Sequence, residues 1–305
     1  MLVASPGGHL DELQILIDLL GIDASDALWV TGKTTQTESL LAGKEVAWLP
    51  RVGSGEMRKA AFGLPAAIRL HRRFRPGLLV STGALFSTPH LVAASMFGCE
   101  TWFIDSATRV DGPSHTGAFA RRFTRAKLFA QGSGWGDERW AHVPSVFDAF
   151  EAVPKQTSFT AEHIRTAVVS LGTELWPFRR AVDRALELLP DTEIYWQTGV
   201  TEATRDGQAL QQWVPAKDLR RAFAESDVVL THAGVGSALG SLEGGAVPVI
   251  LPRRRAHGEM IDDHQVEFAD MMARRSLAVS VDPDELGMEH ILRAANLVAR
   301  RRTAT

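Results

Sequence analysis

Short apolar strand patterns alternate with helical patterns twice along this chain of 305 residues, and the alternation limits the fold more than any other feature. Helical patterns in the first half include Leu10–Leu20, ended by a glycine, and Ala66–Phe74, ended before a proline. The strand candidates of that half are Leu2–Ala4, Ala27–Thr31, Glu45–Leu49, Leu78–Ser81, Thr101–Ile104 and Leu128–Ala130. Such an alternation predicts a parallel sheet covered by helices on both faces.

The second half repeats the pattern after an interruption. Between Val143 and His163, two prolines and the polar run Lys155–Ser158 break the alternation, so we place the domain junction there. The later strand candidates are Ala167–Thr173, Glu193–Gln197, Asp227–Leu230, Val247–Leu251 and Leu277–Val281, and the helices are Phe178–Leu189, Lys217–Ala224, Val266–Arg274 and Asp284 to about Arg301. The expected fold class is α/β, with two doubly wound Rossmann-like domains at residues 1–150 and 151–305, the last helix being a candidate to pack back on the first domain.

Composition excludes several classes of protein. A hydrophobic content of 45% is enough for real cores, and a net charge of −3, from 33 basic and 36 acidic residues, gives no reason to expect nucleic acid. The single cysteine, Cys99, excludes an internal disulfide framework and a thiolate zinc site, and it favours a reducing compartment. No run approaches the roughly 20 apolar residues that span a bilayer, and no charged leader precedes the first glycine turn, so membrane contact is expected to be peripheral.

Two glycine-rich turns follow strand candidates. Thr231–Ser237 runs from an apolar strand into a helix, an arrangement that presents backbone N–H groups and the positive end of the helix dipole to a phosphate. The alternative is an ordinary strand-turn-helix corner. Ser5–Leu10 connects the first strand to the first helix, at the sheet edge where ligands bind in open α/β folds. By itself this second turn is a weak signal, because the full dinucleotide-binding pattern is missing.

Residues around these turns resemble the GT-B glycosyltransferases of family 28, which include the peptidoglycan N-acetylglucosaminyltransferase and the two-subunit dolichol-diphosphate enzyme. In the donor half, the turn is followed by Glu243, Gly245, Pro248 and Pro252, and Pro252–Arg255 with Glu259–Gln265 looks closest to bacterial exopolysaccharide transferases. In the other half, Gly7-Gly8-His9 looks like the family's Gly-Gly-His loop, and Ile104–Val110 looks like its acceptor segment. The resemblance covers nearly the whole chain and implies a GT-B fold, with two domains facing across a cleft.

The resemblance implies a donor site for a UDP-sugar in the second domain. It assigns main-chain and side-chain donors for the diphosphate, a ribose-binding carboxylate and groups that read the sugar hydroxyls. These residues are Gly234, Gly236, His232 and Ser237 for the diphosphate, Gly172 and Thr173 for a second phosphate-facing turn, Glu243 for the ribose, Trp213 for stacking on the base, and His264 and Gln265 for the sugar. Trp213 could equally be a core residue, and Glu243 could be a solvated helix residue.

The acceptor loop Gly7-Gly8-His9 supplies the candidate general base. His9 has an unperturbed pKa near 6.5, so at neutral pH it can accept the proton of a sugar hydroxyl. Its alternatives are to cap the first helix or to bind the diphosphate. Asp105, at a strand end, is the second candidate base, although such an aspartate more often serves structure.

No metal and no cofactor are expected. The only Asp-x-Asp is Asp282-Pro283-Asp284, which with Glu285 predicts an N-cap, a proline at the first helical position and a capping-box glutamate. The dense run Arg253-Arg254-Arg255 could clamp a diphosphate, bind an acidic sugar such as a uronate, or form a solvated loop.

A basic amphipathic stretch suggests a membrane surface. The segment from Met57 to Cys99 contains no acidic residue, and its cations alternate with apolar side chains such as Phe62, Leu64, Ile68, Leu70 and Phe74. The membrane-facing candidates are Arg58, Lys59, Arg69, Arg72, Arg73 and Arg75, and Arg121, Arg122, Arg125 and Lys127 extend the positive character. The alternative is a helix with one solvated basic face.

These expectations combine into one function. The resemblance implies an inverting, metal-independent transferase that moves a sugar from a UDP-sugar to a polyprenyl-diphosphate-linked saccharide, in exopolysaccharide or cell-envelope glycan synthesis. It implies a cytoplasmic protein that is peripheral on the inner face of the cell membrane. The alternatives are a soluble transferase acting on a small natural product, a sugar-nucleotide 2-epimerase, and a non-catalytic binding subunit. The sequence names neither the sugar, the acceptor, the linkage nor the oligomeric state.

Overall fold

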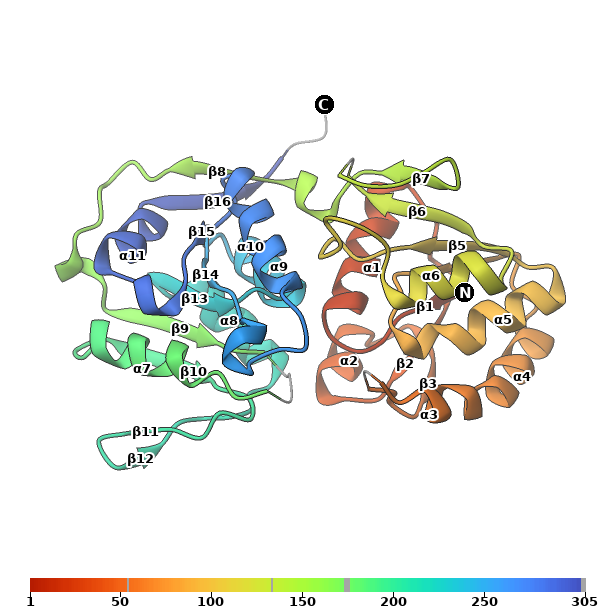
Figure 1. Ribbon diagram of the computed structural model, residues 1–305, viewed down its shortest axis with the longest axis horizontal. Coiled ribbons are helices and arrows are strands. Elements are labelled where there is room, and N and C mark those ends of the chain that lie inside the picture. Colours follow the sequence, from red (N-terminus) through yellow and green to blue (C-terminus); the bar gives the residue numbers. More distant parts are fainter. Residues whose placement is uncertain (54, 133, 173–175, 303–305) are drawn as a thin grey trace. The chain divides into compact units, whose positions relative to one another are not determined.

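Seven parallel strands form one sheet in the N-terminal part of the computed structural model, which describes residues 1–53, 55–132, 134–172 and 176–302 (Figure 1). The strands are β1 (Leu2–Val3), β2 (Leu28–Gly32), β3 (Glu45–Leu49), β4 (Leu78–Ser81), β5 (Glu100–Ile104), β6 (Lys127–Gln131) and β7 (Trp140–Val143). Their order in the sheet is β3-β2-β1-β4-β5-β6-β7. The strand order therefore reverses between β1 and β4, and in such a sheet ligands bind at this switch point.

Helices of this part pack on the sheet and on one another. They are α1 (Gly8–Leu19), α2 (Thr35–Leu40), α3 (Met57–Phe62), α4 (Leu64–Phe74), α5 (Thr88–Phe97) and α6 (His115–Phe123), with a short 3-10 turn η1 (Leu85–Ser87). α5 contacts α3, α4 and α6. Leu91 of α5 and Ala120 of α6 enter one core cluster with Leu79, Phe103 and Leu128 of the strands.

The second part has a five-stranded parallel sheet in the order β10-β9-β13-β14-β15, counted over its described residues. Its strands are β9 (Thr166–Ser170), β10 (Glu193–Gln197), β13 (Val228–His232), β14 (Val249–Leu251) and β15 (Val279–Ser280). Its helices are α7 (Arg179–Leu188), α8 (Ala216–Glu225), α9 (Val235–Glu243), α10 (His264–Arg274) and α11 (Met288–Ala295). Here the strand order reverses between β9 and β13.

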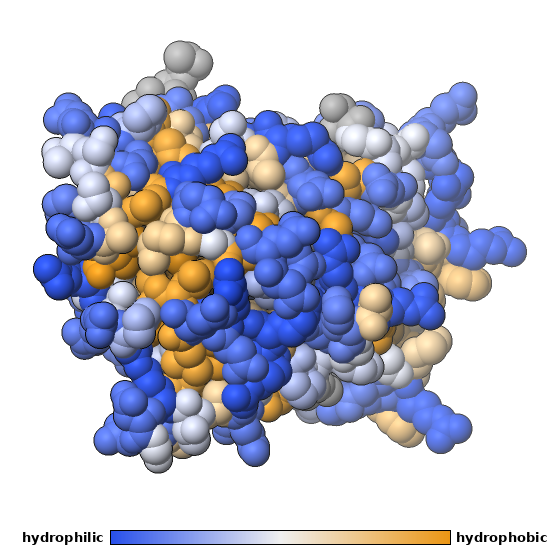
Figure 2. Space-filling view, turned by 60° about the vertical axis from the view of Figure 1, so that its left-hand side comes forward, coloured by the Kyte–Doolittle hydropathy of each residue, from blue (hydrophilic) through white to orange (hydrophobic). Residues whose placement is uncertain are grey.

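Both faces of this second sheet are covered. Ala167 and Val169 point into a core with α7 and α11, whereas Val168 between them points to Phe223 of α8. A strand that is apolar on both faces is typical of a parallel sheet with helices on each side. Figure 2, turned to bring this side forward, shows hydrophobic residues at the surface between hydrophilic ones.

The chain divides into two units, Met1–Val146 and Phe147–Thr305. This boundary lies inside the segment 143–163 that the sequence marks as the junction. The segment is less irregular than expected, because β8 (Phe150–Pro154) lies within it. Two 3-10 turns, η2 (Val146–Ala149) and η3 (Ala161–His163), flank this strand.

The helix predicted from Asp284 to about Arg301 is correct only between Met288 and Ala295, because its first residues belong to a 3-10 turn and its last residues form a strand. α11 ends at Ala295, and β16 (Leu297–Arg301) then pairs antiparallel with β8. Asn296 favours this ending, because its side chain accepts a hydrogen bond from the N–H of Phe159 at 2.7 Å and donates to the Phe159 carbonyl at 3.0 Å. The partner segment lies more than a hundred residues away along the chain, so local periodicity could not reveal the pairing.

Several other helices and strands were not predicted from the sequence. The short helices α2, α3, α5 and α6, the strand β7 and the hairpin of β11 (Thr204–Arg205) and β12 (Gln208–Ala209) are additional. α5 is apolar around most of its circumference, so it shows no clear helical period. Among the described residues, no helix has the length and apolarity that a membrane crossing requires.

Candidate active site

His9 lies at the switch point of the Met1–Val146 unit. Gly7 takes a φ of 89°, which lets the chain turn sharply from β1 into α1 and places His9 in the first turn of that helix. Nδ1 of His9 lies 3.0 Å from the carbonyl oxygen of Thr82, and the Thr82 hydroxyl donates to the carbonyl oxygen of His9 at 2.6 Å. The loops after β1 and β4 are therefore bonded to each other at the point where the strand order reverses.

The Thr82 contact determines which nitrogen of His9 can act as a base. A carbonyl oxygen only accepts, so Nδ1 carries the hydrogen and Nε2 keeps its lone pair. About a third of the side chain, 33%, is exposed. Burial lowers the pKa of His9, and the bond to Thr82 opposes this shift. His9 is thus neutral at pH 7, with Nε2 ready to accept a proton.

The loop after β4 was not singled out from the sequence. Ala84 takes φ 62° and ψ 161°, a region that costs residues other than glycine roughly 1–3 kcal/mol. The preceding Gly83 is held between two serines: its N–H donates to Ser81 Oγ at 3.2 Å, and its carbonyl accepts from Ser87 Oγ at 2.5 Å. A glycine two residues after a buried strand was the available signal for this loop.

The carboxylate of Asp105 is hydrogen-bonded within the loop between β5 and α6. The residue is 1% exposed, and its carboxylate accepts from the N–H of Ser106 at 3.1 Å and of Ser114 at 2.8 Å. Burial raises the pKa of Asp105. A Cβ at Gly117 would lie 2.5 Å from Oδ2, so the carboxylate also fills the space beside that glycine. Of the two candidate bases, His9 is the one that a ligand can reach.

The glycine turns of the second unit enclose the ring of His232. An added Cβ would lie 2.4 Å from the ring at Gly172 and 2.3 Å from it at Gly234. Both glycines are therefore required by packing, independently of any phosphate. Gly172 follows β9 and Gly234 follows β13, so His232 joins the two loops at the switch point of this sheet. Thr173, predicted beside Gly172, lies outside the described residues.

The environment of His232 does not favour the predicted donation to a diphosphate. Nδ1 lies 3.3 Å from the carbonyl oxygen of Ser170, and burial, followed by the charge of Arg253, lowers the pKa of His232 to about 3. The ring is neutral at pH 7, and its one N–H is used by Ser170. His232 therefore supports the turn by packing.

The start of α9 retains the features of an anion site. Gly234, Gly236 and Ser237 are partly exposed, and no side chain among the residues that the structure describes caps the helix at its N-terminus. The first N–H groups of an α-helix have no partner within the helix, and the helix dipole adds partial positive charge there. Glu243 is the last residue of α9, about 12 Å along the axis from its first residue. Its carboxylate accepts from Arg301 at 3.0 Å.

Arg253 is a buried structural residue. It is 1% exposed and donates to the carbonyl oxygens of Leu171 at 3.0 Å and Trp176 at 2.5 Å. Its guanidinium carbon lies 4.6 Å from the ring centroid of Phe178. Both the solvated loop and the diphosphate clamp are therefore wrong for Arg253, because the side chain is buried and both terminal nitrogens of its guanidinium already donate to the chain.

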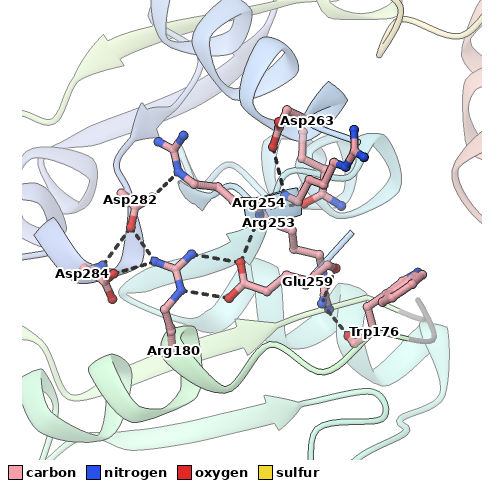
Figure 3. A network of polar contacts seen from close by, with 10 residues as sticks. Trp176, Arg180, Arg253, Arg254, Glu259, Asp263, Asp282 and Asp284 are labelled. Carbon is pink, nitrogen blue, oxygen red and sulfur yellow. Dashed lines mark hydrogen bonds and ion pairs between the residues drawn. The ribbon is translucent and has the colours of Figure 1, made fainter. Parts of the chain in front are cut away.

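Arg254 belongs to a polar network around Arg180 (Figure 3). Arg180 donates to both oxygens of Glu259 at 2.9 Å, to Asp282 at 2.7 Å and to Asp284 at 2.8 Å. Arg254 donates to Asp282 at 2.5 Å, so this cation is also paired. Arg255 is exposed. Asp282 caps the short turn η5 (Pro283–Glu285), which confirms the predicted N-cap and proline.

The predicted sugar-reading and base-stacking residues differ in exposure. Gln265 is 2% exposed, and its side-chain oxygen accepts from the N–H of Arg253 at 3.2 Å. His264 begins α10, and its Nδ1 is bonded to Asp262. Trp213 is 50% exposed, so its alternative as a core residue is wrong. In the described part of the chain, no three His, Cys, Asp or Glu side chains gather as a metal site would require.

Comparison with known proteins gives distant matches. No family model matches the chain. It is 26% identical over 260 residues to the UDP-N-acetylglucosamine--N-acetylmuramyl-(pentapeptide) pyrophosphoryl-undecaprenol N-acetylglucosamine transferase of Chlorobaculum parvum, covering 78% of this chain and 69% of that protein. It is 37% identical over 71 residues to the UDP-N-acetylglucosamine transferase subunit ALG13 of Yarrowia lipolytica, covering 23% of this chain and 34% of the subunit.

Solved structures match the fold over almost the whole chain. The MurG structure of Acinetobacter baumannii superposes with a TM-score of 0.55 at 16% identity, covering 96% of this chain and 88% of that one. The glycosyltransferase SnogD of Streptomyces nogalater superposes with a TM-score of 0.61 at 15% identity, covering 97% and 90%. These matches confirm the predicted GT-B fold.

Proposed function

We propose that this chain, a GT-B glycosyltransferase of the family-28 type distantly related to MurG and ALG13, transfers a sugar from a UDP-sugar to a polyprenyl-diphosphate-linked saccharide. The observation that carries the proposal is His9, an accessible and oriented imidazole at the switch point of the first unit. The second unit offers the uncapped start of α9 at its own switch point. The classes of donor and acceptor are those of the similar Chlorobaculum parvum transferase, as its name gives them.

The proposed reaction is a single displacement with inversion. The acceptor hydroxyl oxygen bonds to the anomeric carbon, the bond from that carbon to the diphosphate breaks, and UDP leaves with the electron pair. Nε2 of His9 takes the hydroxyl proton. Negative charge grows on the leaving diphosphate, so N–H groups at the start of α9 stabilise the transition state more than the ground state. We propose that no metal ion takes part.

Direct assay tests the proposal. Purified protein is incubated with a panel of UDP-sugars and a polyprenyl-diphosphate saccharide, with EDTA present, and both UDP release and the anomeric configuration of the product are measured. Transfer with inversion in EDTA is the expected result. Transfer to soluble natural products in place of the lipid-linked acceptor would favour the small-molecule transferase, and nucleotide binding without transfer would favour the non-catalytic subunit.

We propose Glu243 as the ribose ligand, and the Arg301 pair makes a controlled test possible. Glu243→Ala should weaken UDP binding by about 1.5–3 kcal/mol, the range for hydrogen bonds to a charged group. Arg301→Gln is the matched control, because it removes the same ion pair and leaves the carboxylate. Calorimetric titration with UDP measures both. If both variants bind UDP like the wild type, Glu243 serves only the pair between α9 and β16.

A surface formed by α3, α4, α5 and α6 supports membrane association, and we call it the α3–α6 surface. All six predicted membrane-facing cations are exposed. Large apolar side chains are exposed beside them: Met57 at 73%, Phe62 at 84%, Met96 at 62%, Phe97 at 43% and Phe123 at 66%. Leu70 and Phe74, which alternate with these cations in the sequence, pack against the core instead. Cations mixed with exposed apolar groups suit an anionic bilayer surface, and we propose that this surface brings the enzyme to a lipid-linked acceptor on the inner face of the cell membrane.

Neutralising this surface should weaken binding to anionic vesicles. Changing Arg69, Arg72, Arg73 and Arg75 together to glutamine should lower the binding free energy by several kcal/mol, since each cation near the surface contributes about 1 kcal/mol. Sedimentation with phosphatidylglycerol vesicles at low salt measures the effect. The control set, Arg165, Lys217, Arg274 and Arg293 to glutamine, removes four exposed cations from the second unit and should leave binding unchanged. Equal losses in both sets, or no wild-type binding, would contradict the membrane proposal.

A further inference from the structure

Glu12 is a buried acid one turn after His9 on α1. It is 0% exposed, and no motif in the sequence marks it as a functional residue. Oε1 accepts from the Ser106 hydroxyl at 3.0 Å, from the Ala107 N–H at 2.8 Å and from the Gln131 amide at 3.5 Å. One carboxylate oxygen thus ties α1 to the loop after β5.

The other oxygen faces His9. Within the described residues, Oε2 of Glu12 has no hydrogen-bond partner, and it lies 3.7 Å from Nδ1 of His9. Buried polar atoms are normally hydrogen-bonded, so an unpartnered carboxylate oxygen needs a specific explanation. A negative charge at this distance stabilises an imidazolium, because an opposite charge within about 4–6 Å favours the charged form.

We propose that Glu12 is a positioning residue for His9, which stabilises the charge that the imidazole acquires during sugar transfer. This inference rests on the proposed function. When Nε2 takes the proton of the acceptor hydroxyl, Nδ1 keeps its own hydrogen and continues to donate it to the carbonyl oxygen of Thr82. The ring is then positively charged, and this charge lies beside Oε2 of Glu12. No proton leaves the pair in this step, and the bonds that form and break at the sugar are those of the displacement.

The charges around Glu12 determine the pH at which it acts. His9 faces it from α1, Asp105 faces it from the end of β5, and Arg109 acts on Asp105. The pKa of Glu12 is raised to about 8, chiefly by burial; the hydrogen bonds from Ala107, Ser106 and Gln131 oppose this shift, and the charge of Asp105 adds to it. As the pH rises through about 8, Glu12 gains its negative charge and His9 becomes a stronger base. The rate should therefore rise with pH across this range.

The variant Glu12→Gln tests this role, because it keeps an oxygen for Ser106 and Ala107 and cannot ionise. We expect kcat to fall about tenfold or more, KM for the UDP-sugar to stay unchanged, and the rise near pH 8 to disappear. Asp18→Asn, an exposed acid on the same helix, is the control. A folded Glu12→Gln enzyme with the wild-type kcat and pH profile would overturn the proposal.

A measurement without substrate separates this proposal from the proposed function. In the wild-type protein, NMR titration of the ring nitrogens of His9 should show a second ionisation near pH 8, and a single one in Glu12→Gln. This titration measures the coupling between His9 and Glu12 whether or not the chain transfers a sugar. A failed transfer assay would therefore contradict the proposed function alone. If the titration of His9 in the wild-type protein shows no second ionisation, the proposed role of Glu12 is overturned. This measurement uses the wild-type protein only, so it does not depend on whether a variant folds.

Discussion

Replacing His9 with alanine is expected to lower kcat by roughly 100-fold or more, because general-base catalysis typically contributes 10²–10⁴-fold. A 100-fold loss corresponds to about 2.7 kcal/mol of activation free energy. The UDP affinity should stay close to the wild-type value, since the bonds of His9 are to Thr82, and the nucleotide is assigned to the second unit. Steady-state kinetics with the lipid-linked acceptor and calorimetry with UDP are the two measurements.

The control for this variant is His142→Ala. His142 is an exposed histidine of β7 in the same unit, and its Nδ1 is bonded to the carbonyl oxygen of Gly132. It should keep the wild-type kcat. If His9→Ala loses UDP binding along with activity, His9 is a phosphate ligand, and a base other than His9 and the buried Asp105 has to be sought.

Replacing Arg180 with methionine is expected to destabilise the protein by about 3–5 kcal/mol, the cost of leaving buried charges without their partner. The side chain of Glu259 is 6% exposed and that of Asp282 is 14% exposed, so water would compensate little for the lost cation. Arg254 would still neutralise part of the charge on Asp282. Urea unfolding measures the change in free energy.

The neighbouring Arg179 provides the matched control. It also pairs with a carboxylate, Asp183 at 2.7 Å, but both side chains are more than half exposed. Arg179→Met should therefore cost only about 0–1 kcal/mol. If the two variants are equally stable, the network of Figure 3 contributes no more than a surface ion pair.

The sequence alone determined the α/β class and most of the strands. The bounds predicted for β3, β4 and β10 agree with the structure, because each is a short apolar run between turn residues and is recognisable without its partners. The glycine turns at Gly7 and Gly234 were also visible in the sequence, but only Gly7, with a φ of 89°, reflects a local conformational need.

Tertiary structure decided what each candidate side chain can do. Gly172 and Gly234 make room for the His232 ring, and Arg253 is buried because its donors bind backbone carbonyls from distant loops. The pairing of β16 with β8 and the contact of Glu12 with His9 and the loop after β5 likewise join distant segments or depend on burial. A residue type and its spacing specify the local backbone, whereas burial, protonation and hydrogen-bond partners depend on segments that meet only when the chain has folded.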